Sequence, residues 1–176
     1  MRFMTTAVDG AFVVEREVHA DARGSFERTF CEAEFAAAGI EFRAVQLNLS
    51  RNPHAATLRG MHFQPAPHAE AKLVQCVRGR IFDVALDMRR GSPTYLAHAA
   101  VELDARGSAS LYIPAGVAHG FVTLVDGSDV LYHMGSTHVA GAGDGVRWDD
   151  PTFGIAWPLV PRLISDRDAA YPDYAA

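Results

Sequence analysis

Cysteine is scarce in this chain of 176 residues, which contains only Cys31 and Cys76. Two cysteines are too few for a disulfide scaffold, and their spacing is unlike that of metal-binding cysteines. We expect both to be reduced thiols that are at least partly buried. The sequence therefore argues against a small disulfide-rich secreted domain and favours a cytoplasmic protein.

An excess of positive charge is also lacking. Sixteen lysines and arginines stand against 21 aspartates and glutamates, which gives a net charge of -5. Proteins that bind nucleic acids usually carry a basic patch or an overall basic charge, so we expect no nucleic-acid partner. Any bound anion must instead be held by a local group of arginine, lysine and histidine side chains.

No segment has the length and composition of a signal peptide or a membrane span. Charged residues at Arg2, Asp9 and Glu15 interrupt the first stretch, so no apolar signal core is expected. The longest run without charge, residues 107–125, contains Pro114 and three glycines. Two buried strands around a turn explain this run better than a membrane helix does, and no membrane partner is expected.

Patterns typical of β-strands dominate the chain, 49% of which is hydrophobic. Residues 82–88 alternate between apolar and other side chains with a period of two. Turn signals at 78–79 and at 104–107 predict two hairpins, each joining the strands on its two sides. The length, with no repeat or linker, predicts a single domain over residues 1–176.

One short helix is predicted between Thr29 and Gly39. Thr29 can cap its N-terminus, Glu32 completes a capping box, and Gly39 can end it. The segment 149–176 contains four prolines, so we expect it to be irregular and to pack over the barrel.

The fold class follows from these many short strands. An all-β architecture with one or two short helices is typical of sandwiches and barrels. The spacing of Pro114, Gly116 and His119 is similar to the second motif of the cupins. We therefore predict a cupin-type jelly roll, the double-stranded β-helix.

The segment Leu58-Arg59-Gly60-Met61-His62-Phe63-Gln64 places an arginine beside a histidine at the end of an apolar strand. Strict alternation would direct Arg59 and His62 to opposite faces of the strand. Both can reach one pocket only if the strand bulges or ends there, and Gly60 permits a bulge. The alternative is a surface arginine and a core histidine held by a hydrogen bond.

Metal binding is the main rival role for this histidine. The first cupin motif needs two histidines one residue apart and a nearby carboxylate, but Gln64 occupies the second position here. The remaining candidates are His62, His68, Glu70 and His119. We expect no metal site.

Three further residues complete a chemical inventory, although each also has a structural interpretation. Lys72 could be a solvated lysine, Tyr132 a buried aromatic, and Asp168 part of a charged turn. Together with His62 and His119 they supply a base, a cation, an acid and an orienting carboxylate. Such a set suits proton transfer next to a carbonyl group on an anionic substrate.

Several longer motifs point to one family. The chain resembles the dTDP-4-dehydrorhamnose 3,5-epimerases, metal-free cupins that act on nucleotide-linked 4-keto sugars, from about Val14 to Pro172. The resemblance rests on these segments: 21–26 (DARGSF), 58–64 (LRGMHFQ), 72–74 (KLV), 82–87 (FDVALD), 90–94 (RGSPT), 113–121 (IPAGVAHGF), 147–151 (RWDDP) and 157–158 (WP).

The resemblance implies a role for each matching residue. His62 is the implied general base, Asp168 the carboxylate that orients it, and Tyr132 the general acid on the other side of the sugar ring. The residues implied to surround the sugar and diphosphate are Arg59, Lys72 and His119. Those implied to contact the nucleotide or its phosphates, some across a homodimer, are Arg23, Gln46, Asn48 and Arg167. No metal or other cofactor is implied.

The chain departs from the family pattern outside these catalytic positions. Arg28 replaces a glutamate that meets the thymine, and is itself a candidate substrate contact. The other departures are Leu47 for aspartate, His133 for lysine, Thr137 and His138 for two tyrosines, and Gly143 for glutamate. The nucleotide therefore stays open among dTDP, CDP, GDP and UDP, and inversion at carbon 3, carbon 5 or both is possible. The alternatives are a sugar-nucleotide-binding cupin without catalysis and, second to it, a metal-dependent cupin enzyme.

Overall fold

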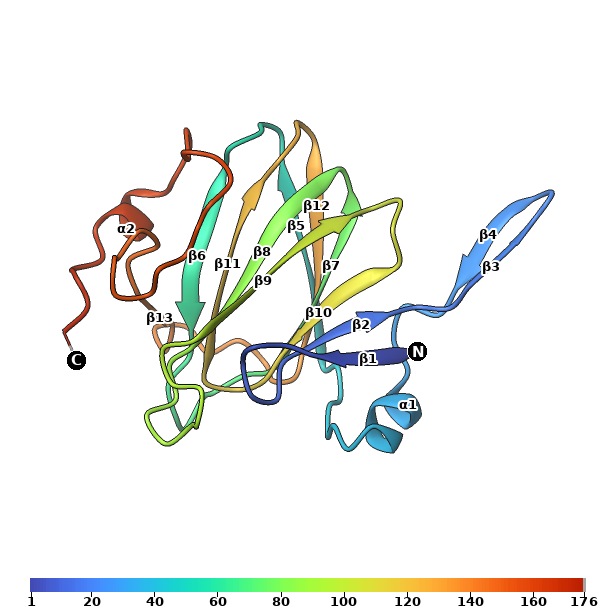
Figure 1. Cartoon of the computed structure of the whole chain (residues 1–176), viewed down its shortest axis with the longest axis horizontal. Coiled ribbons are helices and arrows are strands. Elements are labelled where there is room, and N and C mark those ends of the chain that lie inside the picture. Colours follow the sequence, from blue (N-terminus) through green and yellow to red (C-terminus); the bar gives the residue numbers. More distant parts are fainter. Residues whose placement is uncertain (176) are drawn as a thin grey trace.

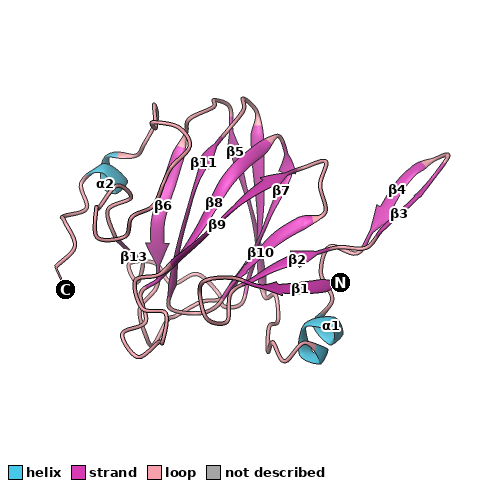
Figure 2. Ribbon diagram, viewed as in Figure 1, coloured by secondary structure: helices cyan, strands magenta, loops and turns pink. Residues whose placement is uncertain are grey.

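Two antiparallel sheets form the body of the molecule in the computed structural model, which describes residues 1–175 (Figures 1 and 2). Ala176, the last residue of the predicted domain, lies outside this description. The six-stranded sheet has the order β1 (Arg2–Thr5), β2 (Phe12–Glu15), β10 (Ala109–Ile113), β7 (Lys72–Arg78), β12 (Ser128–Met134) and β5 (Gln46–Asn52). The five-stranded sheet has the order β13 (Asp144–Gly145), β6 (Leu58–Phe63), β11 (Val117–Thr123), β8 (Arg80–Asp87) and β9 (His98–Asp104).

Successive strands alternate between the two sheets. From β5 to β8, and again from β9 to β12, each strand lies in the sheet opposite to that of the strand before it. This winding is that of a jelly roll, so the predicted fold class is confirmed. A separate hairpin of β3 (Val18–Asp21) and β4 (Gly24–Glu27) projects away from the body (Figure 1).

The two hairpins predicted from turn signals are wrong. The turn at 78–79 connects β7 to β8, and the turn at 104–107 connects β9 to β10, yet each connection joins strands of different sheets. A corner between two packed sheets uses the same turn residues as a hairpin, and it joins strands with the same period of two. The local sequence therefore locates the turn without indicating which strand pairs with which.

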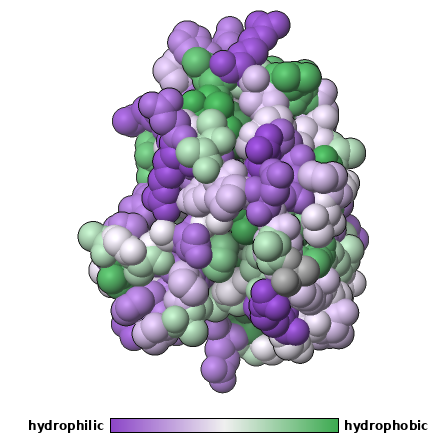
Figure 3. Space-filling view, turned by 90° about the vertical axis from the view of Figure 1, so that its left-hand side faces the viewer, coloured by the Kyte–Doolittle hydropathy of each residue, from purple (hydrophilic) through white to green (hydrophobic). Residues whose placement is uncertain are grey.

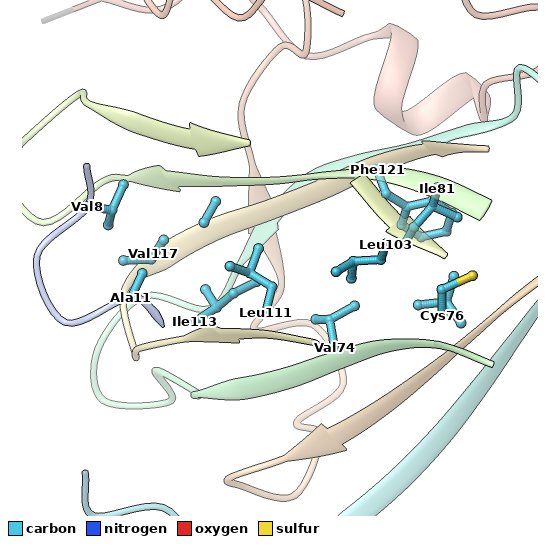
Figure 4. Packing of buried hydrophobic residues seen from close by; sticks show 12 residues of the cluster. Val8, Ala11, Val74, Cys76, Ile81, Leu103, Leu111, Ile113, Val117 and Phe121 are labelled. Atoms are coloured by element: carbon cyan, nitrogen blue, oxygen red, sulfur yellow. The ribbon is translucent and has the colours of Figure 1, made fainter. Parts of the chain in front are cut away.

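The hydrophobic core fills the space between the sheets (Figure 4). Val74 and Leu111 of the six-stranded sheet, and Ile81 and Phe121 of the five-stranded sheet, are at most 1% exposed. Burial of such side chains is the main stabilising term of the fold. It also holds in register the strands that carry the polar residues described below.

The first helix, α1 (Glu32–Ala37), covers the outer face of the six-stranded sheet, where Phe35 packs with Leu73. Gly39 follows the helix with a positive φ of 78°, as its predicted end requires. The predicted capping box is wrong, because Cys31 is the N-cap and its side chain makes no capping hydrogen bond. Thr29 is held elsewhere, since its carbonyl accepts a hydrogen bond of 2.7 Å from Gln75 Nε2.

The chain after Asp149 runs beside β6 and carries the second helix, α2 (Asp166–Ala169) (Figure 1). Ser165 caps this helix by accepting a hydrogen bond from the Asp168 N–H. Hydrophilic and hydrophobic residues are intermixed on this side of the molecule (Figure 3). No helix within residues 1–175 is both long and apolar enough to cross a membrane.

Candidate active site

A cavity of about 620 Å³ lies between the two sheets, and α2 contributes to its wall. It is lined by Asn48 and Ser50 of β5, Leu58, Arg59 and His62 of β6, Lys72 of β7, His119 of β11, Tyr132 and Met134 of β12, Thr57, and Leu163, Ile164, Ser165, Arg167 and Asp168 of the C-terminal segment. Eight of the eleven predicted site residues therefore line one cavity: Asn48, Arg59, His62, Lys72, His119, Tyr132, Arg167 and Asp168.

A bulge in β6 brings Arg59 and His62 into the same cavity. His62 pairs with His119, but Arg59 pairs with Phe121, so two residues of β6 stand opposite Gly120 alone. Of the two possibilities that the sequence left open, a bulge or the end of the strand, the bulge is confirmed. Gly60 has a φ of 134°, and a Cβ added there would collide with the Cα of Gly120. Only glycine fits this position without displacing β11.

His62 forms a close pair with Asp168 of α2. The distance from His62 Nε2 to Asp168 Oδ1 is 2.7 Å, and the Gly60 N–H donates to Oδ2 at 3.2 Å. Burial by itself raises the pKa of Asp168, but the hydrogen bonds from His62 and Gly60 outweigh it and hold the pKa below its ordinary value. Because the carboxyl group is ionised, it fixes the proton on Nε2 and leaves Nδ1 to accept one.

A second pair joins His119 to Asp83 of β8. The His119 Nε2 lies 2.7 Å from Asp83 Oδ1, and both side chains are buried. Asp83 Oδ2 has no hydrogen-bond partner among residues 1–175. The ring of His119 meets Tyr132 edge to face, with centroids 5.7 Å apart.

Tyr132 reaches the cavity from the sheet opposite to that of His62. Its strand, β12, pairs Tyr132 with Val74 on one side and with Asn48 on the other. Burial raises the pKa of Tyr132, and the negative charge of Asp83 raises it further. The phenol therefore stays protonated at neutral pH, as a proton donor must.

Lys72 supplies a buried positive charge and is not a solvated lysine. It is 6% exposed, and its Nζ lies 3.2 Å from Glu70 Oε1. Gln64 Nε2 donates to the other oxygen of Glu70 at 2.7 Å, so the carboxylate is held from two sides. A lysine fixed in this way can face a developing oxyanion without reorganising.

Two arginines add positive charge at the cavity. Arg59 Nε donates to Asn52 Oδ1 at 2.8 Å, and Arg167 Nη2 donates to the Gly143 carbonyl at 2.8 Å. With Lys72 they give the cavity three cationic side chains, although the chain as a whole is acidic. This local concentration of positive charge suits an anionic ligand.

Three predicted contacts do not line this cavity. Arg23 pairs with Asp21 on the projecting hairpin, and Arg28 pairs with Glu34 at 2.6 Å. Arg28 thus does not line the cavity. Gln46 lies on β5 just outside the lining, where its amide group bonds Asn48 Oδ1 and the His138 N–H.

The residues of the rival metal set do not gather. Among residues 1–175, no three histidine, cysteine, aspartate or glutamate side chains lie close enough to share a metal ion. Glu70 is bound to Lys72, and His68 is exposed beyond the cavity wall.

Asp83 and Ser165 are site residues that the sequence analysis missed. Both left a signal. Asp83 interrupts a strongly apolar strand on its inward face, where a charge needs a partner. Ser165 precedes Asp168 by the three-residue interval of an N-cap, which marks the start of a helix. The apolar lining residues Leu163 and Ile164 lie in an irregular segment without periodicity and left no such signal.

Comparisons with known proteins agree on one family. The family model described as dTDP-4-dehydrorhamnose 3,5-epimerase matches residues 5–176. An enzyme of that name from Methanothermobacter thermautotrophicus is 42% identical over 170 residues, which cover 95% of this chain and 91% of the relative.

Solved structures give the same result. The dTDP-4-dehydrorhamnose 3,5-epimerase of Bacillus anthracis, with TDP and PPi bound, superimposes with a TM-score of 0.94 at 34% identity and covers 98% of this chain and 99% of its own. A 3'-monoepimerase from Streptomyces bikiniensis, in complex with dTDP-quinovose, has a TM-score of 0.86 at 35% identity and covers 94% of this chain and 84% of its own.

Proposed function

The chain belongs to the dTDP-4-dehydrorhamnose 3,5-epimerase family, and we propose that its cavity inverts carbon 3, carbon 5 or both in a nucleotide-linked 4-keto-6-deoxy sugar. It is an isomerase of deoxysugar biosynthesis. The proposal for the site rests on one observation above all. A histidine paired with a carboxylate and a protonated tyrosine reach the same cavity from opposite sheets.

The reaction follows from this placement. His62 Nδ1 takes the proton from the carbon next to the ketone, the electron pair of that C–H bond forms a C=C bond to the carbonyl carbon, and the C=O π pair moves to the oxygen. Lys72 stabilises the resulting enolate. Tyr132 then gives its proton to the same carbon from the other side, which inverts it, and solvent returns a proton to the tyrosine while His62 releases its own.

Turnover in deuterium oxide tests the proposal. The protein is incubated with several nucleotide 4-keto-6-deoxy sugars, and NMR or mass spectrometry detects solvent deuterium at carbons 3 and 5. Label at one or both carbons, together with inversion, is expected. If neither carbon gains deuterium with any of the nucleotide sugars, the enzymatic assignment of this cavity is wrong.

We propose a dTDP sugar as the first substrate to test, because the bound Bacillus anthracis relative holds TDP. None of the positions that depart from the family pattern lines the cavity, but the Gly143 carbonyl accepts a hydrogen bond from Arg167, which does. Leu47 is 58% exposed, His138 is exposed, and Arg28 is paired with Glu34. Parallel assays with the CDP, GDP and UDP sugars determine whether these positions change the preferred nucleotide.

We further propose a homodimer. The projecting hairpin carries Phe26, which is 75% exposed, and the edge strand β5 exposes Leu47 and Leu49. Arg23 and Arg28 also lie away from the cavity of their own subunit. Sedimentation over a range of concentrations tests the dimer, and a Phe26→Asp variant should shift it toward monomer. We place the protein in the cytoplasm because its two cysteines are free.

A further inference from the structure

Tyr171 lies beside His62 and is not among the residues that line the cavity. It follows α2 in the C-terminal segment that runs beside β6 (Figure 1). The centroids of the two rings are 6.5 Å apart, with an angle of 60° between their planes. The aromatic ring therefore meets the imidazole that pairs with Asp168, without itself facing the cavity.

The same ring is fixed by the strand next to β6. A Cβ added at Gly145 would clash with Tyr171 Cζ and lie 2.5 Å from its hydroxyl oxygen, so the ring packs directly on this glycine. Gly145 is the residue that pairs with His62 between β13 and β6. Tyr171 thus fills a position that the absence of a side chain at Gly145 leaves open beside the base.

Arg167 packs on the ring as well. Its Cζ lies 5.9 Å from the centroid of Tyr171, within the range of a cation–π contact. Arg167 lines the cavity, so one ring touches both the base and a cationic residue of the site. The Tyr171 hydroxyl is buried and has no hydrogen-bond partner among residues 1–175, so the contacts with His62 and Arg167 are those of the ring.

We propose that Tyr171 is a positioning residue whose ring holds His62 toward Asp168 and Arg167 toward the cavity. This inference rests on the proposed function only for its kinetic consequence. The geometric part, the restraint of the His62–Asp168 pair, applies to the free protein.

Three variants separate the ring from its surroundings. Tyr171→Phe keeps the ring and removes only the unpartnered hydroxyl, so kcat and KM should stay within about twofold of the wild type. Tyr171→Ala removes the ring, and because small displacements of a base are costly, kcat should fall roughly tenfold or more. Tyr174→Ala is the matched control, since Tyr174 docks the same segment through Tyr95 and Phe153.

NMR of imidazole N–H protons gives a readout that needs no substrate. The protons that His62 shares with Asp168 and His119 shares with Asp83 should both resonate far downfield. In Tyr171→Ala the His62 signal should broaden or vanish while the His119 signal stays. If the alanine variant folds poorly, the measurement is repeated with Tyr171→Leu, in which the leucine side chain fills much of the space of the tyrosine.

The inference is overturned if both non-aromatic variants keep the His62 signal and wild-type kcat. It is also overturned if Tyr174→Ala has the same effects, because the role would then be general docking of the segment. Failure of the wild type to turn over any sugar would contradict the proposed function, and the NMR comparison would still decide the role of Tyr171.

Discussion

His119 stands directly opposite His62 in the pairing of β11 with β6, and the Nε2 of each imidazole lies 2.7 Å from its own carboxylate. The two pairs differ in access. The His62 side chain is 40% exposed, whereas that of His119 is 5% exposed. Only the first has an imidazole open to an incoming carbon acid, which is why we assign the base to His62.

Replacing the base should greatly reduce turnover and leave binding nearly unchanged. In His62→Ala we expect kcat to fall by about 10²–10⁴, the usual contribution of a general base, with KM changed little. Deuterium incorporation measures the loss. His68→Ala is the control, since His68 is exposed outside the cavity. A variant that loses only affinity would instead support the non-catalytic sugar-nucleotide-binding role.

Asp168→Asn should change how stability depends on pH. The folded-state pKa of Asp168 lies below its unfolded value, so its ionisation stabilises the fold above the ordinary carboxyl range, near pH 4. This contribution is lost as the pH falls through the folded-state pKa. The melting temperature of the wild type should therefore drop more steeply below about pH 4 than that of the variant. If the melting temperatures of the wild type and the variant fall equally with pH, the His62–Asp168 pair makes no pH-dependent contribution to stability.

Tyr132→Phe should separate exchange from inversion. The variant keeps His62 and Lys72, so the proton can still leave and return on one face. Because the donor on the other face is gone, we expect deuterium to enter the sugar with its configuration retained. NMR of the recovered sugar distinguishes the two products. Inversion at the wild-type rate would assign the donor to another group.

Gly60→Ala should be more destabilising than the same change at Gly24. Both glycines have strongly positive φ values, 134° and 128°, so both variants bear a backbone strain of about 1–3 kcal/mol. Only at Gly60 does the new Cβ meet the backbone of Gly120, whereas nothing lies within 4 Å at Gly24. Urea unfolding should show an additional loss of about 1–3 kcal/mol at Gly60. Equal losses would contradict the steric argument.

Lys72 and Glu70 should be strongly coupled. Lys72→Met leaves a buried carboxylate without its cation, which typically costs about 3–5 kcal/mol. Adding Glu70→Gln removes that charge and should recover much of the loss. A double-mutant cycle measured by urea unfolding gives the coupling, which we expect to be about 1–3 kcal/mol. Additive losses would mean that the two charges do not stabilise each other.

Local patterns in the sequence predicted features that depend on local rules. Gly60 indicated the bulge in β6, and Gly39 indicated the end of α1, because both follow from backbone geometry at one residue. The strand pairing across 78–79 could not be predicted, since the identity of the partner strand depends on the packing of two sheets. The pairing of Asp83 with His119 was missed for the same reason, as it joins neighbouring strands that are distant in sequence.

The carboxylate that partners His62 lies on α2, which follows all of the barrel strands along the chain. During synthesis, a ribosome will therefore have made every strand before it reaches Asp168. Domains can begin to fold while still attached, at about 5–20 residues added per second. A barrel that forms during synthesis would then hold Asp83 beside His119 while His62 still lacks its carboxylate partner, so the proposed base would be completed last.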